Sequence, residues 1–216
     1  MHITRNDIFN GCLVASISHA IMTNTYPQLA YEQSWDGVNY SIHDSQGRHG
    51  TITFEKDFCV GVIRNDNSND IICGDSIQAY MRSFPPRVVQ TAQEDALQYL
   101  LLENRGVVMP CISSVFWVNH MGLYYDSVCA NRIQEDFQLL ENIMLPKEIA
   151  IKRWATYYGM DTEVLALVDF LYHEKSKDFF STIELSKKQQ KLISEKIICD
   201  ECIEAFRELN VVLSTD

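Results

Sequence analysis

Apolar residues recur at every fourth position near the start of the chain. The residues with this spacing are Phe9, Leu13, Ile17 and Ile21. A four-residue period places side chains on one stripe of an α-helix, so the segment predicts an opening helix that buries one face. Tyr26-Pro27 ends the pattern, because the residue before a proline avoids helical backbone.

The period changes to two between Val38 and Arg64. Alternation of apolar and polar residues is typical of strands that bury one face. The apolar positions are Val38, Tyr40, Ile42, Ile52, Phe54, Phe58, Val60 and Val62. We therefore expect an antiparallel β-meander of three strands, with a hydrated polar face opposite the apolar one.

The first turn of this meander, in the segment SIHDSQGRHG, is dense in residues that could do chemistry. Apolar residues stay on one face only if the loop has an odd number of residues, either 46–48 or 45–49. Both loops place His43 opposite Thr51 and His49 diagonally beyond it. Two imidazoles could share a metal ion, but that face offers no third ligand, so we expect no metal site.

Helices and further strands follow the meander. Asp75 has the character of an N-cap for a helix that Pro85-Pro86 ends. Thr91 and Glu94 have the spacing of a capping box, which predicts a second helix that closes near Gly106. Residues 107–118 and 122–128 then predict two strands. The first should lie near an edge, because Pro110 cannot donate a ladder hydrogen bond.

Beyond Ala130 the apolar spacing is helical throughout. The predicted helices are marked by Ile133–Met144, Trp154–Tyr158, Val164–Leu171 and Ser186–Leu209. The fold class is therefore α+β, with the antiparallel β-meander and further strands in residues 1–130 and a helical part in 131–216 packed on them. A chain of 216 residues suits one domain, and we expect a single domain over residues 1–216.

Composition bears on the compartment. The longest apolar run, 107–118, is shorter than the ~20 residues that span a bilayer, and the first residues lack the basic region of a secretory signal. We expect no membrane segment and a cytoplasmic location. The seven cysteines are an odd set without regular spacing, which favours reduced thiols. Cys199 and Cys202 are spaced like metal ligands, but no second pair completes a zinc site.

The formal net charge of −11 limits the classes of partner. Direct nucleic-acid binding is disfavoured, because it depends on Lys and Arg side chains at phosphates. The same charge would accelerate encounter with a basic protein surface. The motifs of phosphate loops, serine hydrolases and zinc proteases are missing, and we expect no metal and no cofactor.

These observations favour a non-enzymatic protein-binding module of the inhibitor, immunity or defence-accessory type. We expect such a module to come from a bacterium or a phage. Its acidic surface is expected to engage a protein partner, and a basic partner fits this charge best. The residues expected to contact the partner surround the first hairpin and are Trp35, Asp36, Tyr40, His43 and His49. The sequence carries no signal for an oligomeric state.

An early cysteine and a later histidine support a second interpretation. Cys12 follows Asn10-Gly11, and a break in the helix there would place it at a helix N-terminus, where the dipole lowers the pKa of a thiol. His120 comes later in the chain and is followed by Asp126. This order is similar to that of papain-like cysteine hydrolases, over about residues 10 to 126. The resemblance implies Cys12 as the nucleophile, His120 as the base and Asp126 or Asn119 as the group that orients the base.

The chain also departs from that family. Leu13 follows the cysteine, where the family carries an aromatic residue or glycine, and Asn6 or Asn10 would have to replace the oxyanion-hole glutamine. The competing interpretation is one unbroken helix, in which Gly11 costs only ~1 kcal/mol. Cys12 would then be inert, and the protein-binding interpretation would stand.

Overall fold

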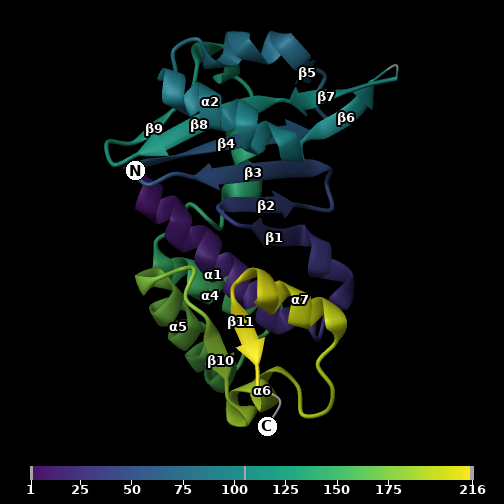
Figure 1. Cartoon of the computed structure of the whole chain (residues 1–216), viewed down its shortest axis with the longest axis vertical. Helices are drawn as coiled ribbons and strands as arrows, with labels where there is room; N and C mark the ends of the chain where they lie inside the picture. The colour runs from purple at the N-terminus through teal and green to yellow at the C-terminus, as the bar shows by residue number, and fades with distance from the viewer. Residues whose placement is uncertain (1, 105, 215–216) are drawn as a thin grey trace. The chain divides into compact units, whose positions relative to one another are not determined.

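The computed structural model describes residues 2–104 and 106–214. The fold is α+β, with an antiparallel sheet in the N-terminal part and helices packed together in the C-terminal part, so the predicted fold class is confirmed (Figure 1). The chain divides into two compact units. One comprises the residues up to Ile8 and Asp36–Glu141, and the other comprises Phe9–Trp35 and the residues from Asn142 onward.

A six-stranded sheet has the order β1-β2-β3-β4-β8-β9. Its strands are β1 (Gln33–Asp36), β2 (Asn39–His43), β3 (Arg48–Phe54), β4 (Phe58–Asn65), β8 (Ser114–Asn119) and β9 (Leu123–Tyr124). β2, β3 and β4 pair antiparallel in sequence order, so the predicted meander is confirmed. β8 pairs antiparallel with β4 on the side away from β3.

The register of the first hairpin differs from the predicted one. His43 lies opposite His49, two residues away from the predicted partner. The turn is built by the carboxylate of Asp44, which accepts hydrogen bonds from the backbone N–H groups of Gln46 (2.9 Å) and Arg48 (3.0 Å). The loop keeps the predicted odd number of residues but is centred one residue earlier, because Asp44 folds the chain back sooner.

Short helices belong to the same unit as this sheet. They are η2 (Gly74–Met81), α2 (Pro86–Glu94), η3 (Ala96–Tyr99), η4 (Ser127–Cys129), α3 (Ile133–Asp136) and η5 (Phe137–Leu140), where η denotes a 3-10 helix. The first predicted helix is η2, which ends at Met81 before Pro85-Pro86 is reached. Its N-cap is Cys73, and the predicted N-cap Asp75 lies in its first turn. Pro86 begins α2, since proline in a first turn loses no hydrogen bond. The predicted capping box at Thr91 is wrong, because Thr91 is buried within α2.

These helices cover both faces of the central strands. Every residue of β4 is buried. Arg87 of α2 lies over the ring of Phe58 on one face, and Phe137 packs edge-on against Phe116 on the other. The predicted hydrated face is therefore wrong. Its buried polar groups bond to each other, as where the Thr53 hydroxyl donates to the side-chain oxygen of Asn39 (2.6 Å).

A second sheet has the order β5-β7-β6 and consists of β5 (Ile72–Cys73), β6 (Leu101–Asn104) and β7 (Val107–Ile112). β6 replaces the end of the second predicted helix, because its backbone pairs with β7. β7 is the central strand, so the predicted edge position of Pro110 is wrong. Pro110 is tolerated there because β5 pairs only with Cys111 and Ile112, the two residues that follow Pro110.

The predicted strand over 107–118 is two strands in two sheets. The chain changes sheet at Ser113, whose N–H donates to the carbonyl of Ile63 (2.8 Å) and whose hydroxyl donates to the buried carboxylate of Asp136 (2.7 Å). The predicted strand over 122–128 shortens to β9. It stops because Asp126 caps η4 by accepting a hydrogen bond from the backbone N–H of Val128 (3.1 Å).

One pair of cysteines is joined in the second sheet. Cys73 of β5 and Cys111 of β7 lie directly opposite each other and form a disulfide, with a Cα–Cα separation of 4.2 Å. The prediction of reduced thiols is wrong for this pair, because strand pairing aligns residues that the sequence gives no reason to join. The free cysteines of the described chain are Cys12, Cys59, Cys129, Cys199 and Cys202.

The second unit is mainly helical. Its elements are α1 (Arg5–Thr23) from Phe9 onward, η1 (Pro27–Glu32), α4 (Lys147–Tyr158), α5 (Thr162–Lys177), β10 (Ile183–Leu185), α6 (Lys187–Ile193), α7 (Asp200–Glu208) and β11 (Val211–Leu213). The predicted opening helix is confirmed. The predicted helix over Ser186–Leu209 is interrupted between α6 and α7. Across the described residues, 2–104 and 106–214, no helix has the length and apolar character to span a membrane.

A buried lysine holds the parallel pair of β10 and β11, which the sequence did not predict. The ammonium group of Lys175 donates to the carbonyl oxygens of Phe179 (3.2 Å), Ser181 (2.5 Å) and Asn210 (3.2 Å). Burial lowers the pKa of Lys175 to about 8, so the group is still mostly charged at neutral pH. The three carbonyls connect the end of α5 to the residue before β11.

Candidate functional site

Two of the residues expected to bind a partner lie in the core. Trp35 is 5% exposed, and its indole N–H donates to the hydroxyl of Ser16 (2.6 Å). Its ring packs against Phe179, with ring centroids 4.6 Å apart. Tyr40 has no exposed surface. Neither side chain presents a surface to a partner in this structure.

The other three expected binding residues have local structural roles. The carboxylate of Asp36 is exposed and accepts a hydrogen bond from the hydroxyl of Tyr99 (2.6 Å). Desolvation, followed by this carboxylate, raises the pKa of Tyr99 to about 12. The rings of His43 and His49 lie 5.7 Å apart, and His49 is 3.2 Å from Asp66. Burial and then the neighbouring His49 lower the pKa of His43.

Cys12 lies within an unbroken helix. α1 runs through Asn10-Gly11 without interruption, and the Cys12 side chain has no exposed surface. Gly11 is required at that position, because a Cβ there would overlap the backbone carbonyl of Ile143. The Asn10-Gly11 dipeptide therefore serves close packing and does not create a helix N-terminus at the thiol.

The other residues implied by the hydrolase resemblance shape loops in the first unit. The side-chain oxygen of Asn119 accepts hydrogen bonds from the backbone N–H groups of Met121 (2.7 Å) and Gly122 (3.2 Å), which form the turn between β8 and β9. His120 is exposed in that turn. Hydrogen bonding to Val128, the largest cause, lowers the pKa of Asp126, whose carboxylate caps η4.

The two closely spaced cysteines fix α7 against the end of α1. The thiol of Cys202 lies 3.2 Å from the carbonyl oxygen of Ala20, and the backbone N–H of Cys199 donates to the side chain of Asn24 (2.8 Å). Desolvation raises the pKa of Cys202 to about 12, so this thiol stays protonated. Within the described ranges, no group of three or more His, Cys, Asp or Glu side chains could hold a metal ion.

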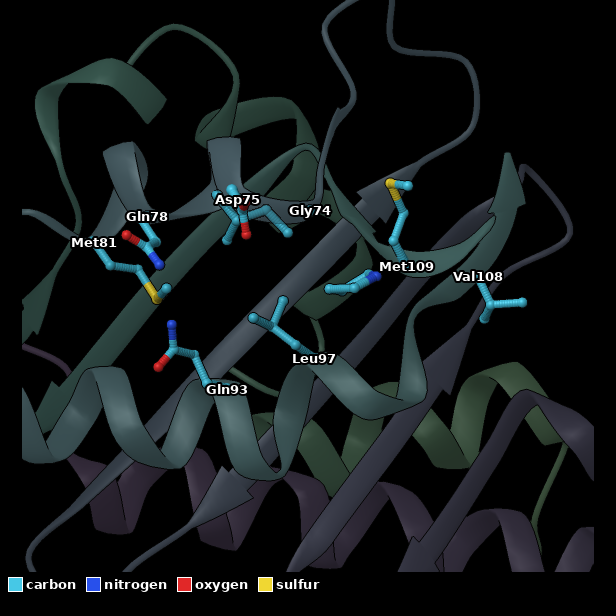
Figure 2. Close-up of a pocket in the computed structure, with 10 residues that line it drawn as sticks. Gly74, Asp75, Gln78, Met81, Gln93, Leu97, Val108 and Met109 are labelled. Carbon is cyan, nitrogen blue, oxygen red and sulfur yellow. The ribbon is translucent and has the colours of Figure 1, made fainter. Parts of the chain in front are cut away.

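The first unit contains an open groove that the sequence did not predict. Its volume is about 340 Å³, and it lies between η2 on one side and α2 with η3 on the other, with β7 contributing a third wall (Figure 2). The apolar residues that line it are Ile77, Met81, Leu97, Val108, Met109 and Pro110. Gly74 begins η2 with a positive φ of 59°, a backbone conformation that glycine adopts without strain.

Three polar side chains also line the groove. Gln78 extends from η2 and Gln93 from α2, and Figure 2 shows their amide ends directed toward each other. Asp75 supplies a carboxylate at the start of η2. All three residues are exposed, and their side chains form no hydrogen bond or ion pair with the described part of the chain. Their donors and acceptors are therefore available to a ligand.

Exposed apolar residues continue beyond the groove along the β6–β7 hairpin. Val107 and Val108 are 55% and 62% exposed, and Leu101 on the paired strand is 40% exposed. Val108 belongs to both the groove and this strip. Val108 and Leu101 share one face of the hairpin, because Leu101 lies opposite Pro110, whereas Val107 points to the other face.

The groove lining combines amides, one carboxylate and apolar side chains. Its lining contains no cysteine, histidine, serine or lysine, so it offers no nucleophile paired with a base. Primary amides both donate and accept hydrogen bonds, as a peptide backbone requires. Methionine side chains adapt to apolar groups of varied shape. An extended peptide segment matches this combination.

The chain was compared with known protein families, curated proteins and solved structures, and no match was found. The groove residues were missed in the sequence because Gln78, Gln93 and Met109 lie on three separate elements. None of these positions has a motif around it. Only the tertiary packing of η2, α2 and β7 brings them together.

Proposed function

We propose that this protein is a non-enzymatic protein-binding module of the inhibitor, immunity or defence-accessory type, acting in the cytoplasm of a bacterial or phage system. It binds an extended segment of its partner in the groove between η2 and α2. The observation that carries the proposal is the groove lining, in which unpaired amides stand among adaptable apolar side chains.

Charge supports a basic partner segment. Among the described residues that line the groove, Asp75 alone is ionisable, and the chain has a formal net charge of −11. A basic segment gains from both, because long-range attraction raises the association rate and a close carboxylate fixes the position of one cation. The basic side chain would lie at the Asp75 end, and apolar side chains would lie near Met81 and Met109.

The hydrolase alternative has no supporting observation in the structure. A catalytic thiolate must be reachable by substrate and must be held by a neighbouring cation or helix N-terminus. Cys12 is fully buried in the interior of α1. We therefore propose the binding function alone.

The test is selection of binders from a random peptide library displayed against the whole protein. We expect the selected sequences to combine Lys or Arg with apolar residues. Replacing Gln78 and Gln93 together by alanine should weaken their binding about tenfold or more, since two hydrogen bonds to the peptide backbone are lost. Asp75→Asn should weaken basic peptides selectively.

Gln134→Ala is the matched control, because Gln134 is an exposed glutamine on α3 that does not line the groove. It should leave peptide affinity unchanged. Selected peptides that bind the Gln78/Gln93 double variant as tightly as the control would contradict the groove as the binding site. A selection that enriches no peptide would contradict the binding function itself.

A further inference from the structure

The strand β7 has a paired strand on both edges over only part of its length. β6 pairs with its first four residues on one edge, and β5 pairs with Cys111 and Ile112 on the other. β5 ends at Cys73, and the chain then turns into η2 at Gly74. Among the described strands, none therefore pairs with the β5 side of β7 at Val108, which lines the groove.

The ladder determines where the backbone groups of Val108 point. In an antiparallel ladder, the N–H and C=O groups of successive residues point alternately to the two edges of a strand. The N–H of Cys111 points to the β6 side, because it donates to the carbonyl of Leu100 (3.0 Å), the residue just before β6. Met109, two positions earlier, shares that side. The N–H and C=O of Val108 therefore point to the other edge, beyond the end of β5.

The pairing of Cys73 with Cys111 supports this assignment. Opposite residues that exchange no hydrogen bonds have Cα atoms about 4.5 Å apart, whereas hydrogen-bonded opposite residues have Cα atoms about 5.5 Å apart. The Cα–Cα separation of Cys73 and Cys111 is 4.2 Å. Cys111 therefore does not direct its backbone groups at β5, and the alternation is the same in both ladders of β7.

Val108 is accessible at this edge. It is 62% exposed, and it lines the same groove as Gln78 and Gln93 (Figure 2). Pro110 has backbone groups on the same edge but has no N–H, so Val108 supplies the donor there. The free edge of a strand is a template for pairing with another extended chain.

We propose that the partner segment binds in the groove as an added β-strand, which pairs with the free edge of β7 at Val108. This inference rests on the proposed function and specifies how the peptide is held. One extended residue can exchange two backbone hydrogen bonds with Val108. The backbone contacts give affinity, and the side chains that reach Asp75 and the apolar walls give specificity.

Hydrogen exchange of single backbone amides, followed by NMR on the whole protein, tests this pairing. The probe is a basic peptide selected from the random library. The Val108 amide should exchange fast in the free protein and about tenfold or more slowly at saturation, because its N–H gains a hydrogen bond. Met109 should exchange slowly in both states, since its N–H faces β6. Unchanged exchange at Val108 in the saturated protein would overturn the added strand.

The variants Val108→Pro and Val108→Ala form a matched pair. Both remove the valine side chain, but only proline removes the N–H, which points away from β6. Val108→Pro should bind the peptide about tenfold or more weakly than Val108→Ala. Thermal unfolding checks that both variants are folded, and the exchange experiment needs neither variant.

These tests separate the added strand from the proposed function. Peptides that depend on Gln78 and Gln93, but bind the two Val108 variants equally, would overturn the added strand and keep the groove as the binding site. A library that yields no binding peptide would overturn both.

Discussion

A glycine determines how closely α1 packs within the helical unit. A Cβ on Gly11 would overlap the carbonyl of Ile143, so the two backbones touch there. Gly11→Ala should therefore destabilise the protein by about 3 kcal/mol, although alanine favours helix, because overpacking outweighs helix propensity. Denaturant unfolding measures the change. A variant as stable as the native protein would show that α1 does not approach Ile143 so closely.

The same helix makes Cys12 unreactive. In the native protein at neutral pH, Cys12 should react with iodoacetamide far more slowly than the half-buried Cys199, because its side chain has no exposed surface. Mass spectrometry of labelled peptides, before and after unfolding, measures both rates. Fast labelling of native Cys12 that is lost in His120→Ala would contradict the buried position and favour the hydrolase.

The histidine pair at the first hairpin should make stability sensitive to acid. Burial and the nearby His49 lower the pKa of folded His43 below its usual value of 6.5. In the window below 6.5 the unfolded chain binds more protons than the folded one, so the free energy of unfolding falls as pH falls. Asp44 acts in the opposite direction and limits the effect.

His43→Gln should reduce this acid sensitivity. Denaturant unfolding between pH 7 and pH 5 should show a smaller loss of stability in the variant than in the native protein. His173→Gln, at an exposed position of α5, is the control and should keep the native slope. Identical slopes for the native protein and the His43 variant would contradict the pKa direction.

At the scale of residues, alternation in the sequence identified strands but not their surroundings. Tyr40 and Ile42 were placed correctly on an apolar face, and both are buried. Thr51 and Thr53 were expected to face water, but short helices from later in the chain cover them. No local pattern indicates what will pack on a strand from elsewhere in the chain.

At the scale of elements, long periodic segments were predicted best. The opening helix and the meander have many residues in one period, and both are confirmed. Short elements were missed where tertiary pairing decides the structure. Leu101–Asn104 reads as helix in the sequence but pairs with β7 as a strand. The groove residues come from η2, α2, η3 and β7, so no local motif could identify the candidate site.

The disulfide stabilises the element that borders the groove. β5 has two residues and pairs with β7 only through Ile72 and Cys73, and Cys73 directly precedes Gly74 in η2. Replacing Cys73 and Cys111 by serine should cost about 2–4 kcal/mol of stability. Hydrogen exchange should accelerate in residues 72–81 and stay slow in β3 and β4.

A reducing agent provides the matched control for this prediction. A small dithiol should destabilise the native protein and leave the serine variant unchanged, because only the native protein has a disulfide to lose. If the dithiol leaves the stability and exchange of the native protein unchanged, the two cysteines are not joined in solution.

At the scale of the whole molecule, the acidic net charge and the groove both favour binding of a basic, extended partner segment. The net charge attracts a basic partner from a distance, and the groove supplies the short-range contacts that hold an extended segment.

The most direct test follows methionine methyl groups by NMR while a selected basic peptide is added to the whole protein. The chain has seven methionines, and among those in residues 2–104 and 106–214 only Met81 and Met109 line the groove. The account predicts that these two signals shift saturably with one peptide per chain. The signals of Met22 and Met160, in the helical unit, should stay in place. Saturable shifts of Met22 or Met160, with Met81 and Met109 unmoved, would contradict binding in the groove.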